Sequence, residues 1–283
     1  MIYVSTGLNK KNFTSKTINI FLKNNITNIE LSSGFYEKNI NKKIIVKKKK
    51  INYLIHNYFP VPKNGFVFNL SSNDKSIRNK SINLAIKAIQ LSKKINANYY
   101  SFHGGFLIDP EINTLGRALE TKILISKKDG IKNFINSVQI LSAEAKKLGI
   151  LLLIENNVLT TENLLKYKKN PLLFVRTNEI ISIMNKLPSN IGILLDVGHL
   201  NISAKTLNFC KYEFIRKCNF WIKGYHLSEN NGLHDQNNPV KENSWFWRFL
   251  KKNLTYSLEI KYKNIPSLKK QIKLANKKIN NLC

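Results

Sequence analysis

The sequence is poor in cysteine, and it has no long apolar segment. Its three cysteines, Cys210, Cys218 and Cys283, form no CxxC pair of the kind that binds zinc, and any disulfide scheme leaves one thiol over. We therefore expect free thiols in a reducing compartment. No apolar stretch approaches the roughly 18 residues of a membrane span, and residues 1–7 lack the pattern of a signal peptide. These absences predict a soluble, cytoplasmic protein with no membrane partner.

Acidic residues are also scarce. The 283 residues include 17 Asp and Glu against 46 Lys and Arg, which gives a formal net charge of +29. Such an excess would suit a nucleic-acid partner, but nearly all the basic residues are lysines, spread along every expected helix among many Asn and Ile residues. That mixture is typical of an A/T-rich coding sequence, and the one dense run, Lys47–Lys50, has the pattern of a solvated turn. The charge alone therefore leaves the partner open.

What the sequence does contain is a regular alternation of short apolar runs and amphipathic segments. Helical periodicity predicts helices over 13–24, 76–96, 130–148, 172–187, 206–218, 245–252 and 267–280, and less clearly over 38–49. Strands are predicted over 1–7, 28–34, 51–56, 99–103, 150–155, 192–196, 221–226 and 255–259.

Eight strands alternating with about eight helices, with no break in composition, predict one domain over residues 1–283 with the fold of an α/β (β/α)₈ TIM barrel. The alternative is a doubly wound open sheet, which usually carries a Gly-rich phosphate-binding turn after its first strand. Thr6–Asn9 is not such a turn. We therefore expect the barrel.

Ionisable side chains gather at the carboxyl ends of the predicted strands. The run Gly192–Asp196 ends in an acid and is followed by His199, and four of the five histidines lie at or just past strand ends. In a TIM barrel all these ends share one face. The side chains that would meet there are His56, His103, Glu155, Asp196, His199, His226 and Glu259.

Carboxylates and imidazoles that face one cavity repel or titrate unless a cation lies among them. A divalent ion accounts for Glu155, Asp196, His226 and Glu259 together, and this mixed oxygen and nitrogen set suits Mn²⁺, Mg²⁺, Co²⁺ or Zn²⁺. The alternative is a set of unrelated strand-end groups, each capped by backbone or water. We expect one divalent metal ion.

Five short motifs occur in the order typical of the xylose isomerase-like TIM barrel superfamily, which this chain resembles from His56 to Lys261. They are Phe102-His-Gly-Gly, Ile154-Glu-Asn, Leu195-Asp-Val-Gly-His, Tyr225-His-Leu-Ser-Glu-Asn and Leu258-Glu-Ile-Lys. The superfamily includes sugar-phosphate isomerases and epimerases as well as the apurinic-site endonuclease IV family.

The resemblance to the epimerases implies a metal-dependent isomerase or epimerase that acts on a sugar or sugar phosphate. Glu155, Asp196, His226 and Glu259 would bind one ion, and the two glutamates would also move the proton through an enediolate that the ion stabilises. The expected substrate contacts are His56, His103, His199, Asp235 and Lys261. Ser228, Asn230 and Gly232, with Lys261, lie where barrels often hold phosphate, although a solvated loop is the simpler interpretation. Assembly into a homo-oligomer is left open.

The resemblance to endonuclease IV implies a different activity, the zinc-dependent repair of abasic DNA. His56, His103, Glu155, Asp196, His199, His226, Asp235 and Glu259 match its ligand positions. The Asp-x-His pair of that family is replaced here by Asp235-Gln-Asn237, and Asn is a poor zinc ligand; His234 could compensate only from the other side of Asp235. DNA is a partner only under this alternative.

Overall fold

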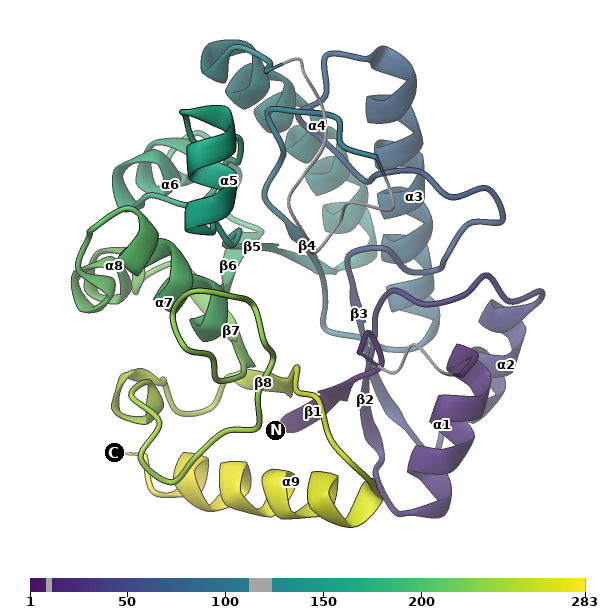
Figure 1. Cartoon of the computed structure of the whole chain (residues 1–283). Helices are drawn as coiled ribbons and strands as arrows, with labels where there is room; N and C mark the ends of the chain where they lie inside the picture. Colours follow the sequence, from purple (N-terminus) through teal and green to yellow (C-terminus); the bar gives the residue numbers. More distant parts are fainter. Residues whose placement is uncertain (9–11, 112–123, 283) are drawn as a thin grey trace.

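Eight parallel strands close into a barrel in the computed structural model, which describes residues 1–8, 12–111 and 124–282. Each strand pairs with its neighbour in sequence, and β1 pairs with β8 to close the ring, so the predicted TIM barrel is confirmed (Figure 1). The strands are β1 Ile2–Ser5, β2 Asn28–Leu31, β3 Asn52–His56, β4 Tyr99–His103, β5 Leu151–Glu155, β6 Ile191–Asp196, β7 Ile222–Leu227 and β8 Thr255–Leu258.

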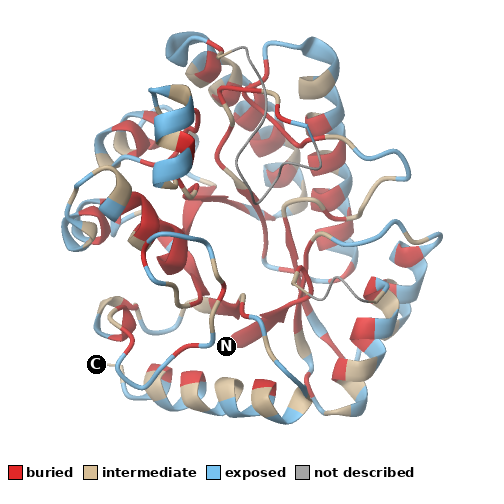
Figure 2. Ribbon diagram, in the orientation of Figure 1, coloured by how far each residue is buried: buried red, intermediate tan, exposed pale blue. Residues whose placement is uncertain are grey.

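The helices surround this ring, and Figure 2 shows that burial is concentrated in the strands and on the inward sides of the helices. Within the described ranges none of them combines the length and apolar character needed to cross a membrane. They are α1 Thr14–Lys23, α2 Ile40–Lys47, α3 Lys75–Lys94, α4 Lys127–Leu148, α5 Thr161–Tyr167, α6 Thr177–Met184, α7 Val197–Thr206, α8 Lys211–Cys218 and α9 Ile265–Asn280, with a 3₁₀ turn η2 at Trp247–Phe249.

Local sequence signals set several helix ends. Asp74 caps α3 by accepting hydrogen bonds from the backbone N–H groups of Ser76 and Ile77. A capping box between Asn264 and Ser267 begins α9. Gly149 ends α4 with a φ of 68°, a left-handed conformation that glycine adopts without steric cost.

Alternation along the strands sends every second side chain into the barrel. Inside the barrel, toward the amino ends of the strands, lies a small apolar cluster that includes Tyr3, Leu54, Leu153 and Leu194. Two residues further along β3, β5 and β6, the same inward side of the barrel carries His56, Glu155 and Asp196. The apolar layer therefore lies below the polar one, which occupies the carboxyl ends of the strands.

Three helix predictions are wrong in their bounds, and the first is wrong because buried apolar residues imitated helical periodicity. The helix predicted over 172–187 begins only at Thr177, since Leu172 and Val175 are buried in a satellite cluster with Ile108 and Leu159. The segment 161–167 forms α5, which was not predicted.

Where one helix was predicted over 206–218 the chain forms two, α7 at Val197–Thr206 and α8 at Lys211–Cys218, and only α8 lies within the predicted range. The first begins directly after β6 because Asp196 accepts a hydrogen bond from His199 N–H and caps the helix. His199 therefore lies on the first turn of α7 and not on an extended strand end. The helix predicted over 245–252 is reduced to η2.

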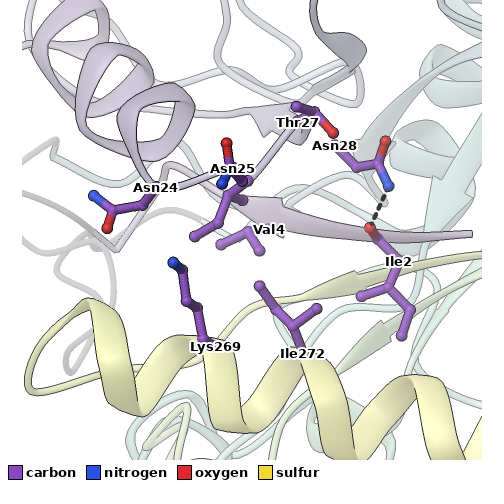
Figure 3. Close-up of a pocket in the computed structure, with 9 residues that line it drawn as sticks. Ile2, Val4, Asn24, Asn25, Thr27, Asn28, Lys269 and Ile272 are labelled. Atoms are coloured by element: carbon purple, nitrogen blue, oxygen red, sulfur yellow. Dashed lines mark hydrogen bonds between the residues drawn. The ribbon is translucent and has the colours of Figure 1, made fainter.

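A cavity of about 250 Å³ lies at the other end of the barrel, between the start of β1, the α1–β2 loop and α9. Asn24, Asn25, Ile2, Val4 and Lys269 line it, and Figure 3 shows Lys269 extending from α9 toward β1 and the α1–β2 loop. It holds no carboxylate or imidazole. The cavity is therefore separate from the acidic and imidazole side chains at the carboxyl ends.

Candidate metal centre

Four side chains from adjacent strands converge at the carboxyl end of the barrel. One ligand atom from each of Glu155, Asp196, His226 and Glu259 lies within 4.8 Å of the other three. His226 Nδ1 is central, 3.2 Å from Glu155 Oε1, 3.2 Å from Glu259 Oε2 and 3.8 Å from Asp196 Oδ2. The four residues predicted as metal ligands are thus brought together.

Several atoms of this cluster are buried without hydrogen-bond partners. Both carboxylate oxygens of Glu155 and the Nδ1 atom of His226 are in this state, and both residues are fully buried. A buried polar atom with no partner costs about 1–3 kcal/mol. Lone pairs of three carboxylates and an imidazole that converge on one point form the donor set of a divalent cation. The residues present therefore fit a metal ion.

Glu155 also faces a second set of imidazoles. Its Oε2 atom lies 3.2 Å from His56 Nε2 and 3.4 Å from His103 Nδ1, and its Oε1 atom lies 3.4 Å from His199 Nδ1. These contacts form two further groups with metal-ligand spacing. The first is His56, Glu155 and His226, and the second is His103, Glu155 and His199. Glu155 is therefore the common member of all three groups found among the described residues.

The expected substrate contacts differ in how far they reach solvent. His56 is 2% exposed and its Nδ1 pairs with Ser101 Oγ at 3.0 Å, so it lies beneath the cluster. The His103 side chain is 25% exposed and borders the mouth. Lys261 is exposed, and its backbone N–H donates to the backbone carbonyl of Asn237. His103 and Lys261 are therefore reached from solvent, whereas His56 is not.

The loop after β7 brings Asp235 to the cluster. Asp235 Oδ2 lies 3.5 Å from His199 Nε2, and burial raises the pKa of this acid while hydrogen bonds from His199 and Asn237 lower it below its usual range. Asn237 is buried and points at Asp235, where the endonuclease pattern has a histidine. His234 is exposed and belongs to none of the ligand groups of the described residues.

The loop residues proposed for phosphate are largely committed to the loop itself. Asn230 donates to the Gly198 carbonyl and accepts from Asn201 and Gly232 N–H. Ser228 is buried, and its hydroxyl makes no hydrogen bond. Of the three residues on the loop after β7, Ser228 alone keeps a polar side-chain atom without a hydrogen-bond partner, and the exposed side chain of Lys261 lies beyond β8.

Charges in the cluster divide the histidines into two kinds. Burial lowers the pKa of His226, but the carboxylates of Glu30 and Glu155 outweigh it and hold the pKa well above its usual range. Burial also lowers the pKa of His199, but Asp196 and Asp235 hold it well above its usual range. Burial, reinforced by the other imidazoles, lowers the pKa of His56 to about 3 and that of His103 well below its usual range. His56 and His103 are therefore neutral and able to bind a metal without losing a proton.

The pKa values of the two glutamates in the cluster are shifted in opposite directions. Burial raises the pKa of Glu155 to about 7, although His226 and His199 act against it. Burial would raise the pKa of Glu259 as well, but the nearby His226 imidazole holds that pKa below its usual range. The pair therefore combines an ionised carboxylate with one that exchanges its proton near neutral pH.

Sequence reasoning missed Glu30 on β2, which is fully buried and lies 3.0 Å from His226. The signal was present, because Glu30 is an acid between two apolar residues, Ile29 and Leu31, of a predicted strand. It was overlooked because this acid lies inside a strand, whereas the other acids and histidines lie at strand ends.

Comparisons with known proteins agree with this geometry. Residues 24–272 match the family described as xylose isomerase-like TIM barrel. No curated protein matches the sequence.

Similar solved structures span nearly the whole chain at low identity. A D-tagatose 3-epimerase-like protein superposes with a TM-score of 0.72 at 19% identity, covering 99% of this chain and 97% of its own. A putative xylose isomerase from Rhodospirillum rubrum has a TM-score of 0.70 at 12% identity, with coverages of 100% and 99%. D-psicose 3-epimerase from Clostridium cellulolyticum H10 has a TM-score of 0.67 at 13% identity, with the same coverages. At these identities the likeness extends to the fold alone.

Proposed function

The chain belongs to the xylose isomerase-like TIM barrel family, and from that premise we propose that it is a divalent-metal-dependent isomerase or epimerase of a sugar or sugar phosphate. The observation that carries the proposal is the meeting of Glu155 and Glu259 around His226 Nδ1, where the atoms of Glu155 and His226 are buried without hydrogen bonds. The similar structures of a D-tagatose 3-epimerase-like protein and of D-psicose 3-epimerase support the same reaction class.

The proposed reaction is a proton transfer at a carbon next to a carbonyl. Glu155, Asp196, His226 and Glu259 would hold one Mn²⁺, Mg²⁺, Co²⁺ or Zn²⁺ ion. When bound, that ion supplies a Lewis acid that makes the C–H bond between a carbonyl and a hydroxyl more acidic.

Glu155 and Glu259 would carry the proton. Because their ligand atoms lie within 4.8 Å of each other, one substrate carbon lies within reach of both carboxylates. One glutamate removes the proton to give an enediolate, and the other returns it to the opposite face or to the neighbouring carbon. A pKa near 7 for Glu155 suits both the loss and the gain of a proton at neutral pH.

His103, His199, Asp235 and Lys261 would bind the substrate oxygens. His103 and Lys261 are the more accessible of them, and Asp235 orients His199 through its Nε2 atom. His56 would act from below, since it is buried against Ser101 and Glu155.

A second candidate, an endonuclease IV-like phosphodiesterase with zinc, is favoured by one observation. Glu155 belongs to three ligand groups, and together they offer more donors than one ion requires. The endonuclease would need a third zinc ion, and Asn237 stands beside Asp235 where that family has a histidine ligand, which argues against this ion. We therefore keep the sugar reaction as the conclusion.

Solvent deuterium exchange tests the proposal. Purified protein loaded with each metal in turn would be incubated in D₂O with a panel of ketoses and ketose phosphates. We expect one bound ion per chain and deuterium at the carbon next to the carbonyl. Glu155→Gln and Glu259→Gln should each abolish exchange, whereas Glu144→Gln, on the helical surface, should retain it. Two or three zinc ions together with incision of abasic DNA would favour the endonuclease instead.

A further inference from the structure

Glu30 forms a carboxylate–imidazole pair beneath the candidate metal centre. Its Oε2 atom accepts hydrogen bonds from His226 Nε2 at 3.0 Å and from Ser257 Oγ at 2.7 Å. Glu30, His226 and Ser257 are all fully buried. The pair links β2 to β7 across the barrel interior and involves no solvent-facing group.

The two nitrogens of His226 face different partners. Nδ1 points at Glu155, Asp196 and Glu259, and it makes no hydrogen bond. Nε2 points at Glu30, which belongs to none of the ligand groups among the described residues. Glu30 is thus behind the imidazole and not among the atoms that converge on the ion.

Nothing in the packing of the barrel explains an acid at this position. The neighbouring interior positions hold Tyr3, Leu54 and Tyr99, and Glu30 Oε1 makes no hydrogen bond. A fully buried carboxylate is costly unless it is paired. His226 is the one ionic partner that Glu30 has among the residues that the structure describes.

We propose that Glu30 is the positioning residue of the metal centre, and that it holds His226 with the proton on Nε2 so that the Nδ1 lone pair faces the ion. The proposal rests on the metal-dependent function above. An acid that accepts the outer N–H of a ligating histidine fixes its tautomer and ring orientation, and makes the inner nitrogen a stronger donor. Ser257 holds the acid in place from β8.

Metal affinity without any sugar tests this role. The dissociation constant for Co²⁺ would be measured by competition with a chromophoric chelator, and the visible spectrum of bound Co²⁺ would report the ligand geometry. We expect Glu30→Gln to weaken binding about 10- to 100-fold and to alter the spectrum, because the amide keeps the shape but lacks the charge. Glu30→Ala should weaken binding further.

Glu179→Gln is the matched control. Glu179 is also a buried acid, with an ion pair to Lys127 at 2.6 Å and a hydrogen bond from Phe174 N–H, but it belongs to none of the ligand groups found in the described part of the chain. Its variant should lose folding stability and keep the wild-type affinity for Co²⁺. Wild-type affinity in folded Glu30→Gln would overturn the proposal.

Two measurements keep the proposal testable if Glu30→Gln does not fold. Ser257→Ala removes one hydrogen bond from the acid and should weaken Co²⁺ binding about fivefold, the equivalent of one hydrogen bond. In the wild-type protein loaded with Zn²⁺, ¹⁵N shifts of His226 should show a protonated Nε2 and a metal-bound Nδ1. The opposite tautomer, or unchanged affinity in Ser257→Ala, would refute the role of Glu30.

The outcomes separate this proposal from the proposed function. Tight metal binding that depends on Glu30, with no sugar exchange in the wild-type protein, would refute the sugar reaction and leave the positioning role in place. A wild-type protein that binds no divalent ion would refute both.

Discussion

Asn156 and Asp196 are joined by two hydrogen bonds at the carboxyl ends of β5 and β6. The Asn156 amide accepts from Asp196 N–H at 2.8 Å and donates to the Asp196 carbonyl at 3.0 Å. The backbone carbonyl of Asn156 in turn pairs with His199 Nδ1 at 2.9 Å. One asparagine thus continues the strand pairing by one step and holds an acid and an imidazole of the candidate centre in place.

Asn156→Asp should disrupt this arrangement. A carboxylate has nearly the same shape, but it cannot donate to the Asp196 carbonyl and adds a negative charge beside Glu155. Loss of a buried hydrogen bond costs about 1–3 kcal/mol, so we expect urea unfolding to report a loss of that size, together with weaker metal binding.

Asn190→Asp is the control for this change, because Asn190 makes an equivalent two-way pair with Ser142 just before β6. It should lose similar stability without a change in metal affinity. If both variants bind metal like the wild-type protein, Asn156 has no role in positioning Asp196.

The sequence was sufficient to predict the barrel and the side chains that meet at its carboxyl end, because both depend on signals that repeat. Alternating runs located the strands to within a few residues, and strand ends that carry Glu155, Asp196 and His226 must meet in a parallel barrel. What could not be predicted depends on contacts between distant residues. The ion pair of Glu30 and His226 joins positions 196 residues apart, and helix α7 begins early because of the cap that Asp196 provides.

Gly198 should tolerate no side chain. A Cβ atom there would lie 2.6 Å from Ser228 Oγ and 3.2 Å from Asp196 Oδ1. We expect Gly198→Ala to destabilise the protein by about 1–3 kcal/mol through overpacking and to weaken metal binding by displacing Asp196. Thermal unfolding and chelator competition would measure the two effects.

The matched control is Gly149→Ala at the end of α4. Its φ of 68° makes alanine unfavourable, yet a Cβ atom there would meet nothing within 4 Å. The backbone strain costs about 1–2 kcal/mol, so stability should fall while metal affinity stays constant. Equal metal affinities in the two variants would contradict the steric argument.

Metal affinity should rise with pH between pH 6 and pH 8. Burial raises the pKa of Glu155 to about 7, so its carboxyl is increasingly protonated below that pH and must lose the proton to bind a cation. His226, whose pKa the carboxylates of Glu30 and Glu155 hold high against the effect of burial, must also release a proton. His56 is already neutral, because burial lowers its pKa to about 3, and contributes none.

Calorimetry in buffers of different ionisation enthalpy would count the protons released. We expect about one per ion near pH 8, from His226, rising toward about two near pH 6 as Glu155 joins it. An affinity that is flat from pH 6 to pH 8 would show that neither group is a ligand.

Asn237→His should add a zinc site to the mouth of the barrel. Asp235 and His199 already lie 3.5 Å apart, and Asn237 points at the same carboxylate. A histidine there would complete three protein ligands, which with a water molecule satisfy the tetrahedral preference of Zn²⁺. Position 237 has a φ of 50°, a conformation in which histidine is among the better tolerated residues.

Elemental analysis after removal of loosely bound metal should therefore find one more zinc ion per chain in Asn237→His than in the wild-type protein. Asn253→His is the control, since Asn253 also has a positive φ, of 63°, but lies in the turn before β8, at the opposite end of the barrel. It should leave the zinc content unchanged. An unchanged content in Asn237→His would mean that Asp235 and His199 are not placed to share an ion, and that more than this one residue separates the site from a trinuclear centre.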